Sequence, residues 1–426
     1  MLGSGLCEQF DKASWVQTKL SETVARHWVT TEYQGLSLSS HFQPIFSISH
    51  RRPVGYEGLL RASTDSGSLI PPPAVLALPS NSKGNLELDR ACRQLHLQNF
   101  ARQETGDCWL FLNLNSQCLV TEQPDAGFMN RLFEMTGIPP SRLVIEILES
   151  EITDRSYLKQ LIKHFRSLGC LIAIDDFGAG HSNFDRIWEL EPDIVKIDRS
   201  LVHEAGKSSR VERILTGIVS LIHEAGSLVV LEGIETRREA LVSIAANADM
   251  VQGFYFAKPQ QLITSNHDEF VSVIDELLQH QQRQRFKNTH QVNENFRRIE
   301  RLFKRAINHF SASQDFEQSS DILFAEKRSV RCYLLDEAGY QMARNSYSPH
   351  YQQTMDVRFT PLLSGDNANW SHKHYHFRAV QHPGQMQLSR PYLSVADSRM
   401  CITVSQTVSS AGKLFVFCCD LDWQDD

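Results

Sequence analysis

The sequence lacks the features of several protein classes. None of its apolar runs approaches the roughly 18 residues that a membrane-spanning helix needs. Its first residues, MLGSGLCEQFDKASW, contain no basic stretch followed by an apolar core, as a signal peptide would. The 43 lysines and arginines are outnumbered by 50 aspartates and glutamates, and the formal net charge of −7 argues against bulk nucleic-acid binding. We therefore expect a soluble cytoplasmic protein without a membrane span.

The nine cysteines also exclude some kinds of site. Their number is odd, no two of them form a CxxC pair, and no Cys/His cluster has zinc-binding spacing. Reduced thiols in a cytoplasm fit this pattern best. For the adjacent pair Cys418 and Cys419 we expect buried, inert thiols without a redox role.

The length of 426 residues allows two or three domains. Between Phe42 and Phe256, short β-rich segments alternate with segments of helical periodicity, which is typical of βα units around a parallel sheet. The candidate strands begin at Phe42, Pro53, Trp109, Leu143, Leu171, Asp193, Leu228 and Met250. The candidate helices cover residues 86–103, 126–135, 157–168, 182–190, 211–226 and 237–248. Eight strands with these crossovers predict an α/β fold, the (β/α)8 barrel.

One strand of this barrel is expected to run antiparallel. Only SHRR separates the first two strands, which is too short for a parallel crossover and suits a hairpin. Residues 1–28 are interpreted as a helical lead-in of unknown role. The barrel domain is assigned to residues 29–265.

Residues 266–315 are assigned to a helical linker. Two helical segments, 267–279 and 291–310, are joined there by the stretch HQQRQRFKNTH. They are interpreted either as a signalling or dimerising helix, or as a barrel-closing helix followed by a solvated connector. Residues 316–426 are assigned to a small, mainly antiparallel α+β domain. Its predicted β segments are VRCYLLD, YQMARN, YHFRAV, QMQLSRPYLS, MCITVSQTV and KLFVFCCDLDW.

Polar residues cluster where the predicted barrel strands end, the place where barrel enzymes carry their active sites. They are Glu57, Asn113, Asn115, Glu146, Glu149, Asp175, Asp176, Lys196, Asp198, Glu232, Glu235 and Gln252. Each alone has a harmless explanation, such as a helix cap for Asp176, a salt bridge for Lys196 or a turn for Glu235. Together, several carboxylates at one barrel mouth are too costly to bury unless cations neutralise them. Oxygen ligands indicate Mg²⁺ or Mn²⁺, and hence a two-metal centre for phosphoryl chemistry.

The adjacent aspartates suit such a centre. At a strand end, Asp175 can point inward and bridge two ions, while Asp176 reaches around the rim to hold one. Lys196, on the next strand, could orient or help deprotonate the attacking water if nearby cations lower its pKa. Arg61, four residues after Glu57, offers a forked donor to a phosphate.

The strings GYEGLLR, FLNLN, IEILE, IDDFGAG, DIVKID, LEGIET and QGFYFAKP, in this order, resemble the EAL-domain family of cyclic di-GMP phosphodiesterases. The resemblance covers about Phe42 to Pro259. It implies a TIM-like barrel with one antiparallel strand, and hydrolysis of cyclic di-GMP to linear pGpG that depends on two Mg²⁺ or Mn²⁺ ions.

The resemblance also implies roles for individual residues. The implied metal ligands are Glu57, Asn113, Glu146, Asp175, Asp176 and Glu232. The implied catalytic residues are Lys196, which coordinates the attacking water, with Glu57, Glu232 and Glu235. The implied substrate-binding residues are Gln43, Arg61 and Gln252, the last as a water-linked support. Glu235 matches the glutamate that steadies the loop after the two aspartates, the loop that links metal binding to dimerisation in this family.

Three positions depart from the family pattern. Gly58 stands in the signature tripeptide where alanine is usual, Ala179 replaces a commoner threonine, and Leu231 replaces an alanine. None of these changes removes a functional group, so we expect an active enzyme. Gly58 is expected to cost some local rigidity.

The C-terminal segment resembles a PAS-like, Cache-type sensory domain of the kind appended to some EAL proteins. Tyr333, Arg378, Tyr392 and Asp420 could line a pocket for a small-molecule signal, or they could be core and turn residues of a dimerising module. A partner protein could also dock on this domain.

Three functions therefore compete. The first is a homodimeric cyclic di-GMP hydrolase regulated by its C-terminal domain. The second is a catalytically silent cyclic di-GMP receptor, and the third is a barrel phosphodiesterase for another phosphodiester. No stretch resembles a diguanylate cyclase, so no synthesising half is expected in this chain.

Overall fold

The computed structural model describes residues 28–114, 126–148, 155–179, 184–263, 268–351, 368–394 and 400–423. The chain divides into two compact units, residues 1–282 and 283–426. The expected helical lead-in before Trp28, as well as Asn115 and Glu149, lie outside the described residues. Within the described ranges, no helix combines the length and the apolarity needed to cross a membrane.

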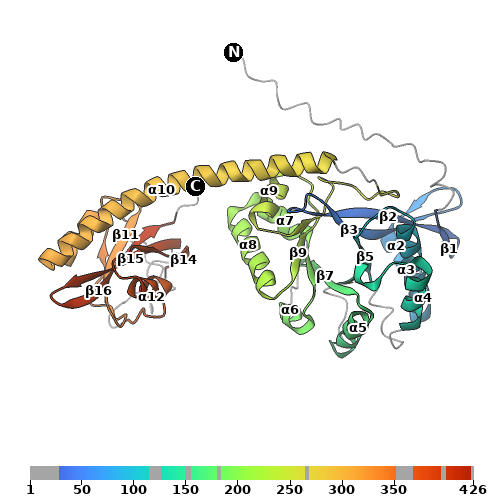
Figure 1. Cartoon of the computed structure of the whole chain (residues 1–426), viewed down its shortest axis with the longest axis horizontal. Helices are drawn as coiled ribbons and strands as arrows, with labels where there is room; N and C mark the ends of the chain where they lie inside the picture. The colour runs from blue at the N-terminus through green and yellow to red at the C-terminus, as the bar shows by residue number, and fades with distance from the viewer. Residues whose placement is uncertain are drawn as a thin grey trace, which may run out of the picture. The chain divides into compact units, whose positions relative to one another are not determined.

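Eight strands of the first unit close into a barrel (Figure 1). They are β2 (Leu36–Ser47), β3 (Arg52–Ser63), β5 (Trp109–Asn113), β6 (Leu143–Leu148), β7 (Leu171–Phe177), β8 (Ile194–Ile197), β9 (Leu228–Leu231) and β10 (Met250–Val251). Neighbouring strands pair in parallel from β3 through β5, β6, β7, β8 and β9 to β10. The strand β2 pairs antiparallel with both β3 and β10 and closes the barrel. The predicted barrel and its antiparallel strand are both confirmed.

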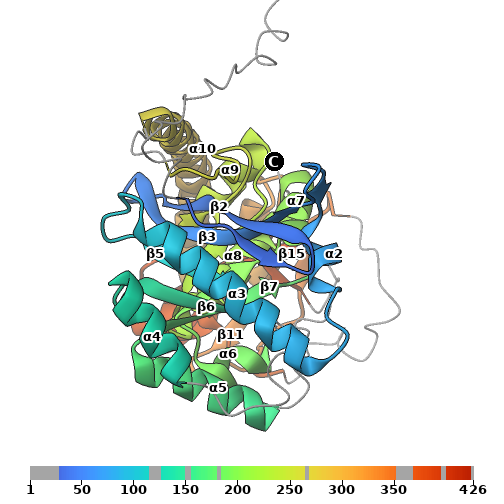
Figure 2. The ribbon, with the colours of Figure 1, turned by 90° about the vertical axis from the view of Figure 1, so that its right-hand side faces the viewer.

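Helices surround these strands (Figure 2). They are α2 (Pro72–Leu76), α3 (Ser82–Ala101), α4 (Ala126–Thr136), α5 (Arg155–Leu168), α6 (Asp185–Leu190), α7 (Arg199–Lys207), α8 (Ser209–Glu224) and α9 (Arg237–Ala245). The sequence did not indicate α2, α7 or the short strands β1 (Thr31–Tyr33) and β4 (Leu69–Ile70), which extend the sheet beyond β2 and β3. The 3₁₀ turn η2 (Pro140–Arg142) leads into β6. Asp198 starts α7 because its side chain accepts a hydrogen bond from the backbone N–H of Ser200.

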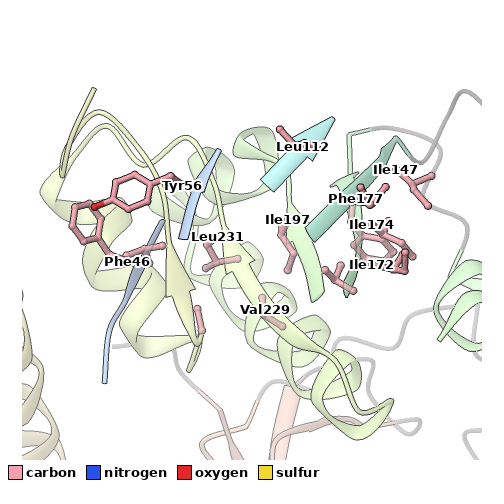
Figure 3. Close-up of a cluster of buried hydrophobic side chains, with 14 of the residues drawn as sticks. Phe46, Tyr56, Leu112, Ile147, Ile172, Ile174, Phe177, Ile197, Val229 and Leu231 are labelled. Carbon is pink, nitrogen blue, oxygen red and sulfur yellow. The ribbon is translucent and has the colours of Figure 1, made fainter. Parts of the chain in front are cut away.

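The core of the barrel has two layers. An outer layer packs between strands and helices, and Figure 3 shows part of it, including Leu112, Ile174 and Leu231. An inner layer fills the barrel itself with Ile45, Phe111, Val144, Ala173, Ile194, Val230 and Met250. Because successive side chains of a strand point to opposite faces, each strand contributes alternately to the two layers.

The helix α10 (Asp268–Ser313) covers both predicted helical segments and the stretch between them. Phe270, Ile274 and Leu277 in its first turns belong to the outer layer of the barrel. Phe303 and Phe310 in its last turns belong to the core of the second unit. The helical periodicity was thus read correctly at both ends, and the polar stretch between them continues the same helix.

The second unit contains a six-stranded antiparallel sheet in the order β12-β11-β16-β15-β13, with β14 also paired to β15. Its strands are β11 (Ser329–Asp336), β12 (Ser346–Tyr347), β13 (Gln387–Leu388), β14 (Tyr392–Leu393), β15 (Met400–Ser410) and β16 (Lys413–Asp422). The helices α10 and α11 (Phe316–Leu323) pack on one face of the sheet, and α12 (His374–Gln381) packs on the other. The predicted mainly antiparallel α+β character is confirmed.

Two predicted strands of this unit are wrong. The segment YQMARN forms no strand, and only Tyr340 and Gln341 make isolated bridges in it. The segment YHFRAV forms the helix α12, because its buried residues Tyr375 and Ala379 are four positions apart and share one helical face. The segment QMQLSRPYLS also forms no continuous strand. It divides into β13 and β14 on either side of Pro391, which has no backbone N–H to donate to a ladder.

Candidate functional site

Strand alternation gathers the predicted site residues on the inner face of the barrel. On each parallel strand, the residue two positions after an inner-layer residue also points inward, one step nearer the carboxyl end. These residues are Asn113, Glu146, Asp175, Lys196, Glu232 and Gln252. On the antiparallel strand β2 the corresponding residue precedes Ile45, and it is Gln43, which pairs in register with Glu57 on β3.

The ammonium group of Lys196 lies at the centre of this cluster. Its Nζ is 2.6 Å from Oε1 of Glu232 and 3.1 Å from Oδ1 of Asp175. It also contacts Oε1 of Glu146 and lies 3.8 Å from Oε2 of Glu57. The Lys196 side chain is 1% exposed and that of Glu146 is fully buried. One buried cation is thus shared by four carboxylates from four different strands or strand ends.

This cluster holds an excess of negative charge. Burial raises the pKa of Glu146 well above its ordinary value, an effect that Lys196 only partly offsets. Burial likewise raises the pKa of Glu232. Burial alone would lower the pKa of Lys196, but Asp175, Glu146 and the other carboxylates outweigh it and hold that pKa well above its usual range. Lys196 is therefore a charged counter-ion to these carboxylates, and a lowering of its pKa by bound cations stays a prediction.

The two adjacent aspartates are held by an irregular strand end. The pairing of β7 with β8 shifts register between Ile174 and Phe177, and Asp176 has a φ angle of 55°. This left-handed conformation is strained for a residue other than glycine, and it turns Asp176 toward the barrel mouth. Burial, and then the charge of Asp175, raise the pKa of Asp176 to about 6.

Glu57 is held by two amides. Nδ2 of Asn113 donates to its Oε1 at 2.9 Å, and Nε2 of Gln252 donates to its Oε2 at 2.7 Å. Gln43 instead donates from Nε2 to the backbone oxygen of Ala257 at 3.2 Å. The structure thus brings Asn113 and Gln252 into the cluster through Glu57, while Gln43 lies beside it.

A pocket of about 240 Å³ opens above the cluster. It is lined by Gln43, Glu57, Asp176, Asp198, Arg199, Glu232, Gly233, Glu235, Gln252, Gly253 and Phe254. The sequence analysis gave no role to Arg199 or Phe254, although Arg199 directly follows the motif DIVKID and Phe254 lies within the motif QGFYFAKP. Gly233 and Gly253 allow close approach, because added β-carbons would lie 2.2 Å from Cβ of Arg199 and 2.1 Å from the backbone oxygen of Ile234.

Two predicted residues lie at the edges of this arrangement. Glu235 is exposed at the pocket rim, and its backbone N–H donates to Oε2 of Glu239 in the capping box of α9. The loop that it is predicted to steady continues into residues 180–183, outside the described residues. Arg61 is half-buried, and its Nη1 donates to the backbone oxygen of Leu60 at 2.8 Å. It is not among the described residues that line the pocket.

The predicted C-terminal pocket residues separate into two groups. The hydroxyls of Tyr333 and Tyr392 both donate to Oδ1 of Asp420, and Nε of Arg331 donates to its Oδ2. Arg378 is exposed on α12 and does not join them within the described residues. Asp420 is 1% exposed and hydrogen-bonded on both oxygens, which favours a packed interior over a pocket. Cys418 and Cys419 are buried on opposite faces of the sheet, and burial raises the pKa of Cys418.

The donor set of the barrel fits hard divalent cations. Asp175, Asp176 and Glu232 each offer a carboxylate oxygen, and these oxygens lie within 4.8 Å of one another. Oε2 of Glu146 and Oε1 of Gln252 are buried and accept no hydrogen bond from the described residues. Counting Asp176, five carboxylates face one ammonium, an excess of four formal charges that two divalent ions would balance.

Known relatives are similar either to nearly the whole chain or to about half of it. The EAL-domain-containing protein YkuI of Bacillus subtilis, itself described as uncharacterized, is 25% identical over 402 residues, which cover 88% of this chain and 93% of YkuI. The signalling protein YkoW of the same organism is 26% identical over 225 residues, covering 51% of this chain. The cyclic di-GMP phosphodiesterase NbdA of Pseudomonas aeruginosa is 27% identical over 235 residues, covering 53%. The matches span 28% of YkoW and 29% of NbdA.

Solved structures show the same fold. The crystal structure of Bacillus subtilis YkuI in complex with cyclic di-GMP and calcium matches with a TM-score of 0.75 at 23% identity, covering 91% of this chain and 97% of that one. A standalone EAL protein of Vibrio cholerae with bound cyclic di-GMP matches with a TM-score of 0.51 at 23% identity, covering 56% of this chain and 99% of that one. The first likeness extends over both units of the chain.

The family model of the EAL domain matches residues 28–259, more than half of the chain. The matched range contains the eight barrel strands and every residue of the acidic cluster around Lys196. The chain belongs to the EAL-domain family.

Proposed function

We propose that the chain is a cyclic di-GMP phosphodiesterase, which hydrolyses one phosphodiester bond of cyclic di-GMP to give linear pGpG with two divalent cations, Mg²⁺ or Mn²⁺. The observation that carries this proposal is the buried cluster of carboxylates around Lys196 at the floor of a pocket. Its excess negative charge is unfavourable unless cations neutralise it, which suits a site built to hold cations.

The charge of the pocket supports metal-dependent substrate binding. Its lining contains five carboxylates and, as the one cation among the described lining residues, Arg199. A phosphodiester anion would be repelled by such a surface without bound metal. The pocket therefore favours a substrate that enters together with cations, and a cyclic dinucleotide is what the YkuI crystal structure holds together with calcium.

Each residue has a role in this proposal. The metal ligands are Glu57, Asn113, Glu146, Asp175, Asp176 and Glu232. When bound, the ions supply an activated water and neutralise the charge that develops on the phosphoryl group. Lys196 orients that water, and Gln252 holds Glu57 in place by the hydrogen bond to its Oε2. Gln43 and Arg61 contact the substrate, and Glu235 steadies the loop after Asp176.

The test is an incubation of the full-length chain with cyclic di-GMP and either Mg²⁺ or Mn²⁺, with EDTA as the control, followed by chromatography of the products. The proposal predicts pGpG that appears with metal and is absent with EDTA. Intact cyclic di-GMP after prolonged incubation of folded protein with either metal would contradict it.

A silent receptor is the second candidate, because two departures from the family pattern adjoin functional positions. Gly58 follows Glu57, and Leu231 precedes Glu232. Equilibrium binding of cyclic di-GMP by calorimetry distinguishes the candidates. Binding without pGpG would favour the receptor, and competition by other cyclic dinucleotides or diesters tests the third reading, a different phosphodiester substrate.

We further propose that residues 316–426 regulate the barrel as a PAS-like or Cache-like sensory domain within a cytoplasmic homodimer. The likeness to YkuI over both units supports this assignment. The cyclic di-GMP hydrolysis rate of the full-length chain, measured over a range of protein concentrations, tests the dimer. Light scattering identifies the concentrations at which the chain is a monomer. A hydrolysis rate per chain that stays the same down to those concentrations would contradict the proposed homodimer.

A further inference from the structure

Gly58, the middle residue of the signature Glu57-Gly58-Leu59, is buried on the outer face of β3. Its neighbour Glu57 points into the barrel, so position 58 points out toward α3. A β-carbon added at Gly58 would lie 3.1 Å from Cγ of His96 and 3.1 Å from Cδ2 of Leu112. Both separations are shorter than an ordinary van der Waals contact. The family's usual alanine would therefore require these neighbours to give by a few tenths of an ångström.

The His96 ring has little freedom to withdraw. It projects from α3 and is 5% exposed, and its Nδ1 lies 2.9 Å from Oγ of Ser40 on β2. The ring of Phe42, the register partner of Gly58, meets it edge to face at a centroid distance of 6.4 Å. Asn99, one turn further along α3, donates to the same Ser40 hydroxyl at 3.3 Å. The ring is thus held between α3 and the hairpin of β2 and β3.

Glu57, which precedes Gly58, must be placed accurately to act as the proposed metal ligand. Both carboxylate oxygens of Glu57 are fixed by hydrogen bonds, from Asn113 at 2.9 Å and from Gln252 at 2.7 Å. If the ring does not yield, an added β-carbon must move β3 itself by a few tenths of an ångström. Such a movement shifts Glu57 relative to Gln252, because Gln252 follows β10, which pairs with β2 and β9 and not with β3.

We propose that the ring of His96 occupies the space beside position 58 and requires glycine there, because a larger residue at 58 would displace Glu57. Gly58 and His96 form a coupled pair, and the glycine is a requirement of this packing. The inference rests on the proposed function only in that it takes Glu57 to be a metal ligand.

The test uses Mn²⁺ binding, measured by titration calorimetry on the full-length chain. Gly58→Ala is expected to weaken Mn²⁺ binding by at least about tenfold, the usual scale for losing support of a metal ligand. The double variant Gly58→Ala/His96→Ala is expected to recover most of that loss, since it opens the space beside the new methyl group. His96→Ala alone leaves Gly58 in place and is expected to bind Mn²⁺ within about threefold of the wild type. The pGpG formation rate should follow the same order.

Gly217→Ala is the matched control, because Gly217 lies in α8 with nothing within 4 Å of an added β-carbon. It should bind Mn²⁺ like the wild type. Circular dichroism at the titration temperature separates misplacement of Glu57 from unfolding. Wild-type Mn²⁺ affinity in Gly58→Ala, or no recovery in a folded double variant, would overturn the inference. A wild type that binds Mn²⁺ but forms no pGpG would refute the proposed function alone, and the coupling would still be measured.

Discussion

The chain buries two ionic centres, one in each unit, and they are built on opposite principles. In the barrel, Lys196 is surrounded by four carboxylates, and Oε2 of Glu146 has no partner among the described residues. In the C-terminal sheet, Asp420 faces one cation, Arg331, at 2.8 Å, and its second oxygen accepts from Thr403 at 2.7 Å. One centre is unbalanced in charge and the other is neutral.

This difference in net charge distinguishes a candidate ligand site from a structural ion pair. A neutral, fully hydrogen-bonded pair is a stable end state, and removing either member leaves an uncompensated charge. A cluster with more carboxylates than cations needs further positive charge to be neutral. Buried carboxylates in such a cluster therefore indicate a ligand site. This contrast explains why similar acidic residues are interpreted as metal ligands in one unit and as packing in the other.

The largest expected effect comes from removing one carboxylate of the unbalanced centre. Asp175→Asn should lower the rate of pGpG formation by at least about 100-fold, because it removes a proposed metal ligand. In EDTA its thermal midpoint should equal or exceed that of the wild type, since one of several like charges is gone. Initial rates by chromatography and melting curves in EDTA check both parts. Undiminished hydrolysis would remove Asp175 from the site.

The corresponding change in the neutral centre should act on stability instead. Asp420→Asn removes the buried carboxylate charge that Arg331 contacts and should cost about 3–5 kcal/mol. Urea unfolding gives the free energy, and hydrogen exchange in β11 and β16 shows whether the loss is local. The double variant Arg331→Met/Asp420→Asn should regain much of it, and an equally unstable double variant would argue that the pair is not the cause.

His96 is a buried titratable group that is kept neutral, in contrast to both ionic centres. Burial, with a smaller effect of Arg61, lowers its pKa to about 4. Between the ordinary value of 6.5 and about 4 the unfolded chain binds a proton that the folded chain does not, so folding stability falls as the pH falls through this window. From pH 7 to 4.5 the wild type should therefore lose about 2–3 kcal/mol more than His96→Ala. Urea unfolding of both proteins at the two pH values gives the difference, and equal losses would show that His96 titrates normally.

The smallest effect is expected at an exposed pair. Nη2 of Arg237 on α9 lies 3.1 Å from Oε1 of Glu276 on α10, and the two side chains are 44% and 71% exposed. Water screens such a pair, so Arg237→Ala should change the free energy of unfolding by less than about 1 kcal/mol. Urea unfolding measures it, and a loss as large as that of Asp420→Asn would show that exposure does not separate these cases.

Much of the barrel could be predicted from the sequence, because buried parallel strands are short apolar runs and each ends on a polar residue. The four-residue link before β3 was enough to predict the antiparallel strand. The helix α7 was missed, since it starts directly after β8 at Asp198 and leaves no separate polar linker. The segment YHFRAV was misassigned because its β-branched and aromatic content suits a strand, whereas its burial follows a helical spacing.

The identity of the site residues could be predicted from the sequence, but the contacts between them could not. Motif order gave Glu57, Glu146 and Asp175, yet nothing in the sequence indicates that one lysine contacts all three. The significance of Gly58 was also invisible, since the contact with His96 joins residues 38 positions apart through packing of α3 on β3. Such contacts depend on tertiary structure, which local patterns do not encode.

The most direct test of the central claim is the number of Mn²⁺ ions that the chain binds, measured by elemental analysis after equilibrium dialysis. Each wild-type chain is expected to bind two ions, none in EDTA, and Asp175→Asn is expected to bind fewer than two. Asp420→Asn should keep both ions, as the neutral centre takes no part in binding. A wild-type chain that binds no Mn²⁺, or an Asp175→Asn variant that binds as many ions as the wild type, would contradict the claim that the unbalanced charge of the barrel is a metal site.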